Sequence, residues 1–346
     1  MNRRVAYIDF AKGLSMCIVM LFHIKGILNV QYGTIVENLL FSACMLPPFF
    51  CISGLFFKEQ DSARVFFLKK IFRLLIPFMG FYLLTAVALP NFLHYYFGMD
   101  FGTVLGWPSL WAFIWPGEYP NIPLWFLWSL FLMNILFWII CRISTKWFPN
   151  HRIPAMIAMV AAFTLLGNIA GYALTQDIAT LCKTLQNLPF FFVGYCIAKR
   201  RDVFILNTTF INKRLFYLIV TLPAVLFAAY LPSLLSDESV VADIMLFYIQ
   251  GIIGIGFVLA FSAFFDHVRL ISYLGRHNIV ILLSHGLLVR LCAPIVISLS
   301  QAIGAHAAII ALWLLLIAAY FLFIVVLRKI LRLFTLFNPL IYRIFA

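Results

Sequence analysis

The sequence predicts an all-α fold, a polytopic membrane helical bundle of about ten transmembrane helices. Of the 346 residues, 64% are apolar and only 11% are charged, whereas soluble chains average about 45–50% apolar and about 25% charged residues. The chain also divides into ten apolar stretches, each close to the roughly 20 residues that a helix needs to cross a bilayer. One integral membrane domain, residues 1–346, accounts for the whole chain.

The predicted spans follow one another with polar or proline-containing connections. We expect helices at residues 8–28, 36–57, 71–90, 122–141, 153–174, 179–198, 215–235, 241–264, 278–299 and 304–327. Prolines in or beside these spans predict kinks at Pro77, Pro189, Pro223 and Pro294. The first run contains charged residues and lacks a small-residue cleavage site, so we interpret it as a retained span and not as a signal peptide. Residues 328–346 are expected to form a short amphipathic cytoplasmic tail on the membrane surface.

The distribution of charge predicts the orientation of the helices. The chain has 25 Lys and Arg against 12 Asp and Glu, a formal net charge of +13. Most of these cations lie in alternate connections, as expected for cytoplasmic loops, and the intervening connections contain none. Both termini are therefore predicted to be cytoplasmic, in a multi-pass protein of the plasma (inner) membrane. Because topology explains the charge, nucleic-acid binding is not expected, and cysteines without CxxC spacing predict no metal site.

Ionisable side chains within a span are candidate functional residues because the bilayer makes them costly. Lys12 and His23 share one face of the first predicted helix, about 16 Å apart along its axis, and Asp9 can pair with Lys12 at i, i+3. No carboxylate on this helix reaches His23, so an orienting partner must come from another helix or from the outer loop. A core histidine hydrogen-bonded to a neighbouring helix is an equally good interpretation of His23.

The second span contains two helix-disrupting features. Pro47 and Pro48 remove two backbone donors, and Ser53 and Gly54 are small residues one to two turns later, so this helix is expected to bend or open there. Irregular backbone at membrane depth is tolerated where it is buried in protein or lines a cavity. A simple packing kink is the alternative.

Two further sets of polar residues are candidates. Lys70 and Arg73, at i and i+3 where the third span begins, are suited to binding phosphates, although ordinary cytoplasmic cations explain them as well. In the ninth span, His285 is a candidate ligand or proton relay, or else an interhelical hydrogen-bonding residue. Arg290 cannot lose its charge and must find an acid, carbonyl groups or water.

Several segments in chain order carry a resemblance to a known family. The first helix has Lys12 followed by ten residues and His23, and the other segments are FFCISGLFF from Phe49, IPLWFLWSLF from Ile122, PFFFVGY from Pro189 and LGRHNIVILLSHGLL from Leu274. Together they resemble the acyltransferase 3 family of integral membrane O-acyltransferases. The family's Arg-x-x-Arg motif is here Lys70-Ile71-Phe72-Arg73, which keeps the charge but loses one bidentate guanidinium.

The resemblance implies transfer of an acetyl or other short acyl group from cytoplasmic acyl-CoA to a hydroxyl of a cell-surface glycan or lipid-linked saccharide. It implies a catalytic His23 accompanied by Asp9 and Lys12, and acetyl-CoA bound by Lys70 and Arg73. The substrate pocket is expected to include Ser53, Gly54, Trp125, His285 and Arg290. His23 is either a general base or a nucleophile that carries the acyl group. A secondary transporter or flippase for a lipid-linked glycan or small solute is the alternative function.

Overall fold

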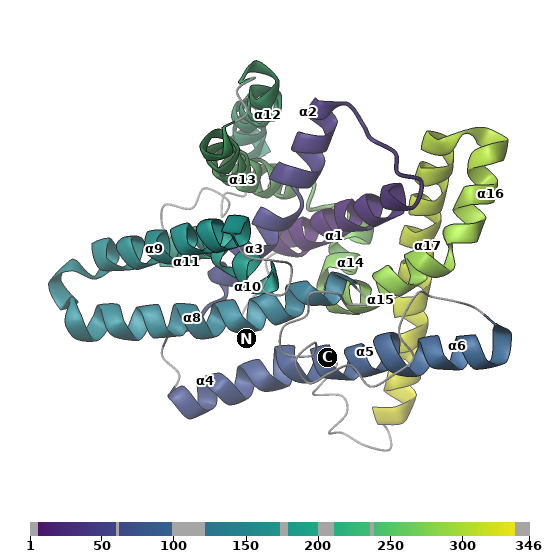
Figure 1. Cartoon of the computed structure of the whole chain (residues 1–346), viewed down its shortest axis with the longest axis horizontal. Helices are drawn as coiled ribbons and strands as arrows, with labels where there is room; N and C mark the ends of the chain where they lie inside the picture. The colour runs from purple at the N-terminus through teal and green to yellow at the C-terminus, as the bar shows by residue number, and fades with distance from the viewer. Residues whose placement is uncertain are drawn as a thin grey trace.

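Helices are the only regular secondary structure in the described part of the chain. The computed structural model describes residues 6–59, 62–98, 122–173, 179–199, 211–235 and 239–335, and all regular elements within these ranges are helical (Figure 1). Seven helices in these ranges are long and apolar enough to cross a membrane, and a bent pair makes an eighth. The predicted all-α polytopic bundle is therefore confirmed. The count of ten spans and the cytoplasmic position of both termini stay predictions.

The elements follow the chain in the predicted order. The first half contains α1 (Ala6–Ile27), α2 (Thr34–Glu37), the π-helix η1 (Asn38–Ala43), α3 (Leu46–Leu55), α4 (Ala63–Lys70), the π-helix η2 (Ile71–Leu75), α5 (Ile76–Tyr82), the π-helix η3 (Leu83–Ala88), α6 (Leu89–Phe97), the 3₁₀ turn η4 (Ile122–Leu124) and α8 (Trp125–Trp147). The second half contains the 3₁₀ turn η5 (Pro149–His151), α9 (Arg152–Ala173), α10 (Ala179–Gln186), α11 (Leu188–Lys199), α12 (Ile211–Leu234), α13 (Val240–Phe264), α14 (Arg269–Arg276), α15 (Asn278–Leu291), α16 (Ala293–Ile303) and α17 (Ala305–Thr335).

Helix α1 lies in the middle of the bundle and contacts α3, α13, α14, α15 and α17 (Figure 1). Its contact with α14 is made backbone to backbone at two glycines. A Cβ at Gly13 would lie 2.1 Å from the Ile271 carbonyl oxygen, and a Cβ at Gly275 would lie 1.7 Å from that of Asp9. Small residues let membrane helices approach this closely. Because α15 begins two residues after α14 ends, the same contact brings the start of α15 to α1.

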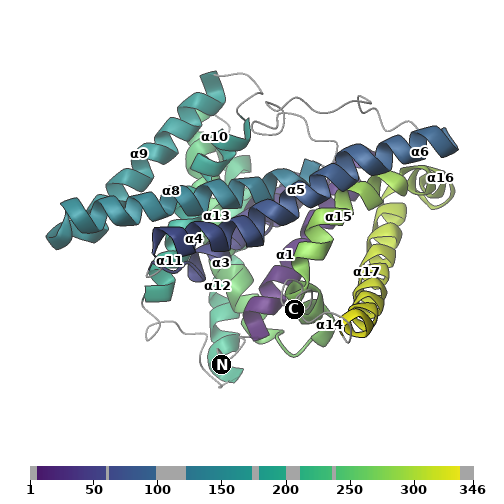
Figure 2. The same ribbon diagram turned by 90° about the horizontal axis from the view of Figure 1, so that it is seen from below.

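The three π-helical segments each precede a proline. Segment η1 comes before Pro47 and Pro48, η2 before Pro77 and η3 before Pro90. A proline lacks a donor and clashes with the carbonyl of residue i−4, and a locally wider helix relieves both problems. The predicted span 71–90 is thus the middle of a longer rod, α4 to α6, that crosses one side of the bundle in Figure 2.

The predicted opening of the second span at Ser53 and Gly54 is wrong. The interruption lies earlier, in a turn at Cys44 and Met45, and α3 is regular through Ser53 and Gly54. The two prolines occupy the first turn of α3, where their missing N–H groups would have had no intrahelical partner.

Near the C-terminus the structure confirms one prediction and corrects another. The kink predicted at Pro294 is confirmed, because the span 278–299 is a pair, α15 and α16, bent by 59°, with Pro294 at the start of α16. The tail expected from residue 328 onwards continues α17 as far as Thr335. Residues 336–346 of that tail lie outside the described residues. No proline or glycine stands between Phe321 and Thr335, so nothing in the sequence ends the helix of the last span at residue 328.

Candidate functional site

Two histidines from distant parts of the sequence meet inside the bundle. His23 of α1 and His285 of α15 have ring centroids 5.2 Å apart, with their planes inclined by 55°. His285 is fully buried, whereas His23 is half-buried. Each was a separate candidate from the sequence, but only the packing of α15 on α1 shows that they are neighbours. Because imidazole gains and loses a proton near neutral pH, this pair is a candidate for proton transfer.

The tautomer of His285 follows from its backbone contact. Its Nδ1 lies 2.8 Å from the Ile281 carbonyl oxygen, one turn earlier in α15. A carbonyl can only accept a hydrogen bond, so Nδ1 carries the proton, and Nε2 of the neutral ring is an acceptor. This Nε2 is buried and has no hydrogen-bond partner among the described residues.

The other side chains described around His23 are an aromatic ring and a cation. Phe22 meets the His23 ring edge-on, at 5.5 Å between centroids, and the Arg290 guanidinium is close enough to repel a charge on it. Within the described ranges Arg290 has no ion pair. The environment of His23 is therefore one in which a developing negative charge is stabilised.

The N-terminal end of α1 has partners that the sequence did not predict. The Asp9 carboxylate lies 3.9 Å from Nε of Arg276 in α14, and Lys12 Nζ lies 4.9 Å from the centre of the Phe56 ring. Arg276 is the residue after Gly275, whose close contact with the Asp9 backbone brings the two side chains together. The pairing of Asp9 with Lys12 stays a prediction.

Ser53 and Gly54 have local and packing contacts in α3. The Ser53 hydroxyl donates to the Phe49 carbonyl, 2.9 Å away. A Cβ at Gly54 would lie 1.9 Å from the Phe191 carbonyl oxygen of α11, and a Cβ at Gly194 would meet the Cys51 carbonyl oxygen at the same distance. Gly54 therefore serves the close contact of α3 with α11. Its assignment to the substrate pocket stays a prediction.

Trp125 begins α8 and has a cation over its ring. Nζ of Lys183, in α10, lies 5.2 Å from the centre of the Trp125 ring. One turn further along α8, the Thr184 hydroxyl donates to Ser129 at 2.8 Å. These contacts join α8 to α10, and they give Lys183 an aromatic partner.

Lys70 and Arg73 lie where α4 passes into η2. Lys70 is half-buried, with Nζ 5.5 Å from the centre of the Phe66 ring, whereas Arg73 is exposed. The change to a π-helix at Ile71 alters the angle between the two positions relative to an α-helix. Their role in binding a phosphorylated ligand stays a prediction.

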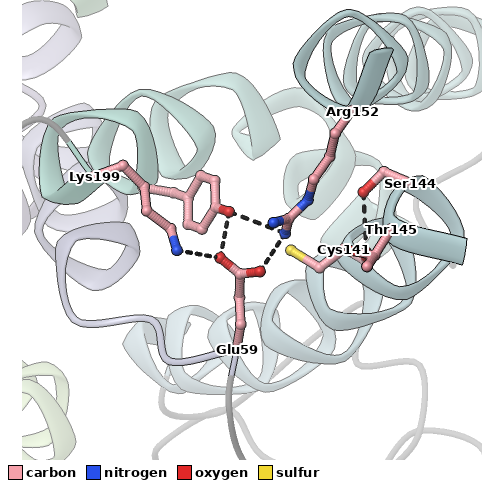
Figure 3. Close-up of polar contacts among 7 residues, drawn as sticks. Glu59, Cys141, Ser144, Thr145, Arg152 and Lys199 are labelled. Carbon is pink, nitrogen blue, oxygen red and sulfur yellow. Dashed lines mark hydrogen bonds and ion pairs between the residues drawn. The ribbon is translucent and has the colours of Figure 1, made fainter. Parts of the chain in front are cut away.

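One polar cluster was missed from the sequence. Figure 3 shows Glu59, in the connection between α3 and α4, receiving hydrogen bonds from Arg152 of α9 and Lys199 of α11. The hydroxyl of Tyr195, also in α11, donates to the same carboxylate. The distance to Lys199 Nζ is 2.8 Å. Burial acts to raise the pKa of Glu59, but the hydrogen bonds from Lys199, Tyr195 and Arg152 outweigh it and lower the pKa to about 2. The sequence signal was a pair of acidic residues, Glu59 and Asp61, in a connection that is otherwise basic.

The comparison with protein families gives one match over nearly the whole chain. A family model described as an acyltransferase domain, acyltransferase 3, matches residues 5–329. The chain belongs to the acyltransferase 3 family. No curated protein and no solved structure matches it. Membership makes the chain a membrane acyltransferase and favours that function over the transporter that the sequence also allowed.

Proposed function

We propose that this acyltransferase moves an acetyl or other short acyl group from cytoplasmic acyl-CoA to a hydroxyl of a cell-surface glycan or lipid-linked saccharide. The supporting observation is the meeting of His23 and His285 within the bundle of a family member. Imidazole is the side chain whose unperturbed pKa lies closest to neutral pH. A half-buried imidazole on a central helix is well placed for proton transfer between two substrates.

In the proposed reaction, His23 acts as the general base. Its unprotonated ring nitrogen takes the proton of the acceptor hydroxyl while the hydroxyl oxygen attacks the thioester carbonyl carbon. The tetrahedral intermediate then expels the CoA thiolate, which takes the proton back from His23 as the ester forms. Arg290, a permanent cation near His23, is suited to stabilising the negative carbonyl oxygen of the intermediate.

The donor is expected to enter from the cytoplasmic side. Lys70 and Arg73 would hold the phosphates of acetyl-CoA, Arg73 through its guanidinium and Lys70 as a point charge. The acyl arm would then extend about 16 Å from the level of Lys12 to that of His23. Membrane lipids surround the bundle, and the acceptor would approach from the other side.

The proposal is tested with membranes and acetyl-CoA labelled in the acetyl group. We compare label incorporated into the glycan and lipid fractions by the wild type, by His23→Ala and by His94→Ala, at matched expression. His94 is exposed on α6 and serves as the control. We expect His23→Ala to lose incorporation while His94→Ala retains it. Equal incorporation by the wild type and His23→Ala would contradict the catalytic assignment.

A further inference from the structure

We propose that His285 is the positioning residue for His23, accepting its ring N–H at Nε2 and so holding it in one tautomer with the other nitrogen free to act as the base. The inference rests on the proposed function of His23. It supplies the orienting partner that α1 itself lacks, and that partner is a second imidazole instead of a carboxylate.

The first step of the argument concerns His285 alone. The contact between Nδ1 and the Ile281 carbonyl fixes both the tautomer and the orientation of the ring. Nε2 is thereby an obligate acceptor, and in the fully buried His285 it has no described partner. Buried acceptors are costly when unpaired, and a catalytic role is one of the reasons for which native proteins keep them.

The second step concerns which donor can reach that acceptor. The ring centroids of His23 and His285 lie 5.2 Å apart, a separation at which two imidazoles form an N–H···N hydrogen bond if the two nitrogens face each other. In the proposal, a rotation of the His23 side chain makes them do so. His23 is the more exposed of the two, whereas the His285 ring is held by its own helix. His23 is therefore the ring that turns.

The third step concerns the alternatives around His23. Of the side chains whose contact with it is described, Phe22 has no acceptor and Arg290 is only a donor. His285 is the one that offers an acceptor. A neutral histidine that donates from one nitrogen must keep the other unprotonated. The hydrogen bond to His285 thus prepares a base before the acceptor hydroxyl arrives.

The test compares three variants at position 285 or 23. His285→Phe keeps the ring but removes Nε2, His285→Gln keeps an acceptor at a similar distance, and His23→Ala removes the base. Size-exclusion chromatography in detergent confirms that each is folded. With labelled acetyl-CoA and native membranes, we expect His285→Phe to lower kcat by about 10- to 100-fold with an unchanged KM for acetyl-CoA. This loss is smaller than the roughly 10⁴-fold that follows replacement of a triad carboxylate. His285→Gln should recover to within a few-fold of the wild type.

A spectroscopic measurement separates positioning from direct binding of the acceptor. Nitrogen-15 solid-state NMR of histidine-labelled protein without substrates should show one tautomer for His23, assigned by its loss in His23→Ala, and a mixture in His285→Phe. An unchanged His23 tautomer in His285→Phe overturns the proposal and would mean that His285 binds the acceptor substrate instead. Full activity of His285→Phe also overturns it. If His23→Ala stays active, the proposed function itself fails.

Discussion

Gly275 of α14 lies so close to Asp9 of α1 that a Cβ on the glycine would be 1.7 Å from the Asp9 carbonyl oxygen. The contact is backbone against backbone, so neither partner can move aside as a flexible side chain would. It holds α14 on α1 and, through the short connection at His277, sets the position of α15. The alignment of His285 with His23 depends on it.

The first prediction concerns this contact. Gly275→Ala should force α14 away from α1, lowering the free energy of unfolding by about 1–3 kcal/mol and reducing acetyl transfer. Thermal unfolding in detergent and transfer of labelled acetyl groups measure the two effects. Gly256→Ala is the matched control, because a Cβ there has nothing within 4 Å. A Gly275→Ala protein as stable and as active as Gly256→Ala would show that α1 and α14 do not pack this closely.

The second prediction concerns Glu59. Glu59→Gln removes the carboxylate that joins the α3–α4 connection to α9 and α11, and we expect the free energy of unfolding to fall by about 1–3 kcal/mol. Lys58→Gln, a change at an exposed position of the same connection, should have little effect. The melting temperatures of the purified variants at neutral pH make the comparison. Equal melting temperatures for the Glu59 and Lys58 variants would show that the Glu59 cluster does not stabilise the fold.

The third prediction concerns how the stabilisation by Glu59 depends on pH. The folded pKa of Glu59, about 2, lies below its ordinary value of 4.5, so its contribution to stability is fully present above pH 4.5 and is lost as the pH falls towards 2. The difference in melting temperature between the wild type and Glu59→Gln should therefore be constant from pH 7 to pH 4.5 and should shrink below pH 4.5. A difference that disappears above pH 5 would assign the effect to another group.

The fourth prediction concerns the donor. Arg73→Gln should raise the KM for acetyl-CoA several-fold with little change in kcat, because a phosphate contact would act equally on the ground and transition states. The effect should weaken at high salt, since Arg73 is exposed. Arg64→Gln, an exposed cation at the start of α4, is the control. A similar change of KM in both variants would mean that general positive charge, and not Arg73, attracts the donor.

The fifth prediction separates the two possible roles of His23. If His23 is a general base, protein incubated with labelled acetyl-CoA and no acceptor should acquire no covalent label. Purified protein is denatured rapidly and counted, with His23→Ala treated in parallel. Label on the wild type that is absent from His23→Ala would instead establish an acyl-enzyme intermediate on that histidine.

Much of the fold could be read from composition and spacing, because membrane helices are largely local structures. The first, fourth, fifth and eighth predicted spans match α1, α8, α9 and α13 to within a few residues at most ends, with α8 the longest extension. The breaks were harder to place. Proline alone does not show whether a helix kinks, widens or starts anew, and the chain widens before Pro77, restarts at Pro47 and bends at Pro294.

The sequence by itself determined that this is a helical membrane protein, that it resembles a family of acyltransferases, and that His23, His285 and Arg290 are costly within the membrane. Only the tertiary structure decided that the two imidazoles are neighbours, that Gly54 is a contact between helices, and that Glu59 joins three separated segments. The physical reason is that hydropathy and helix periodicity act over a few turns of one segment. Contacts between helices depend on which small residues let two backbones approach, and that depends on both partners at once.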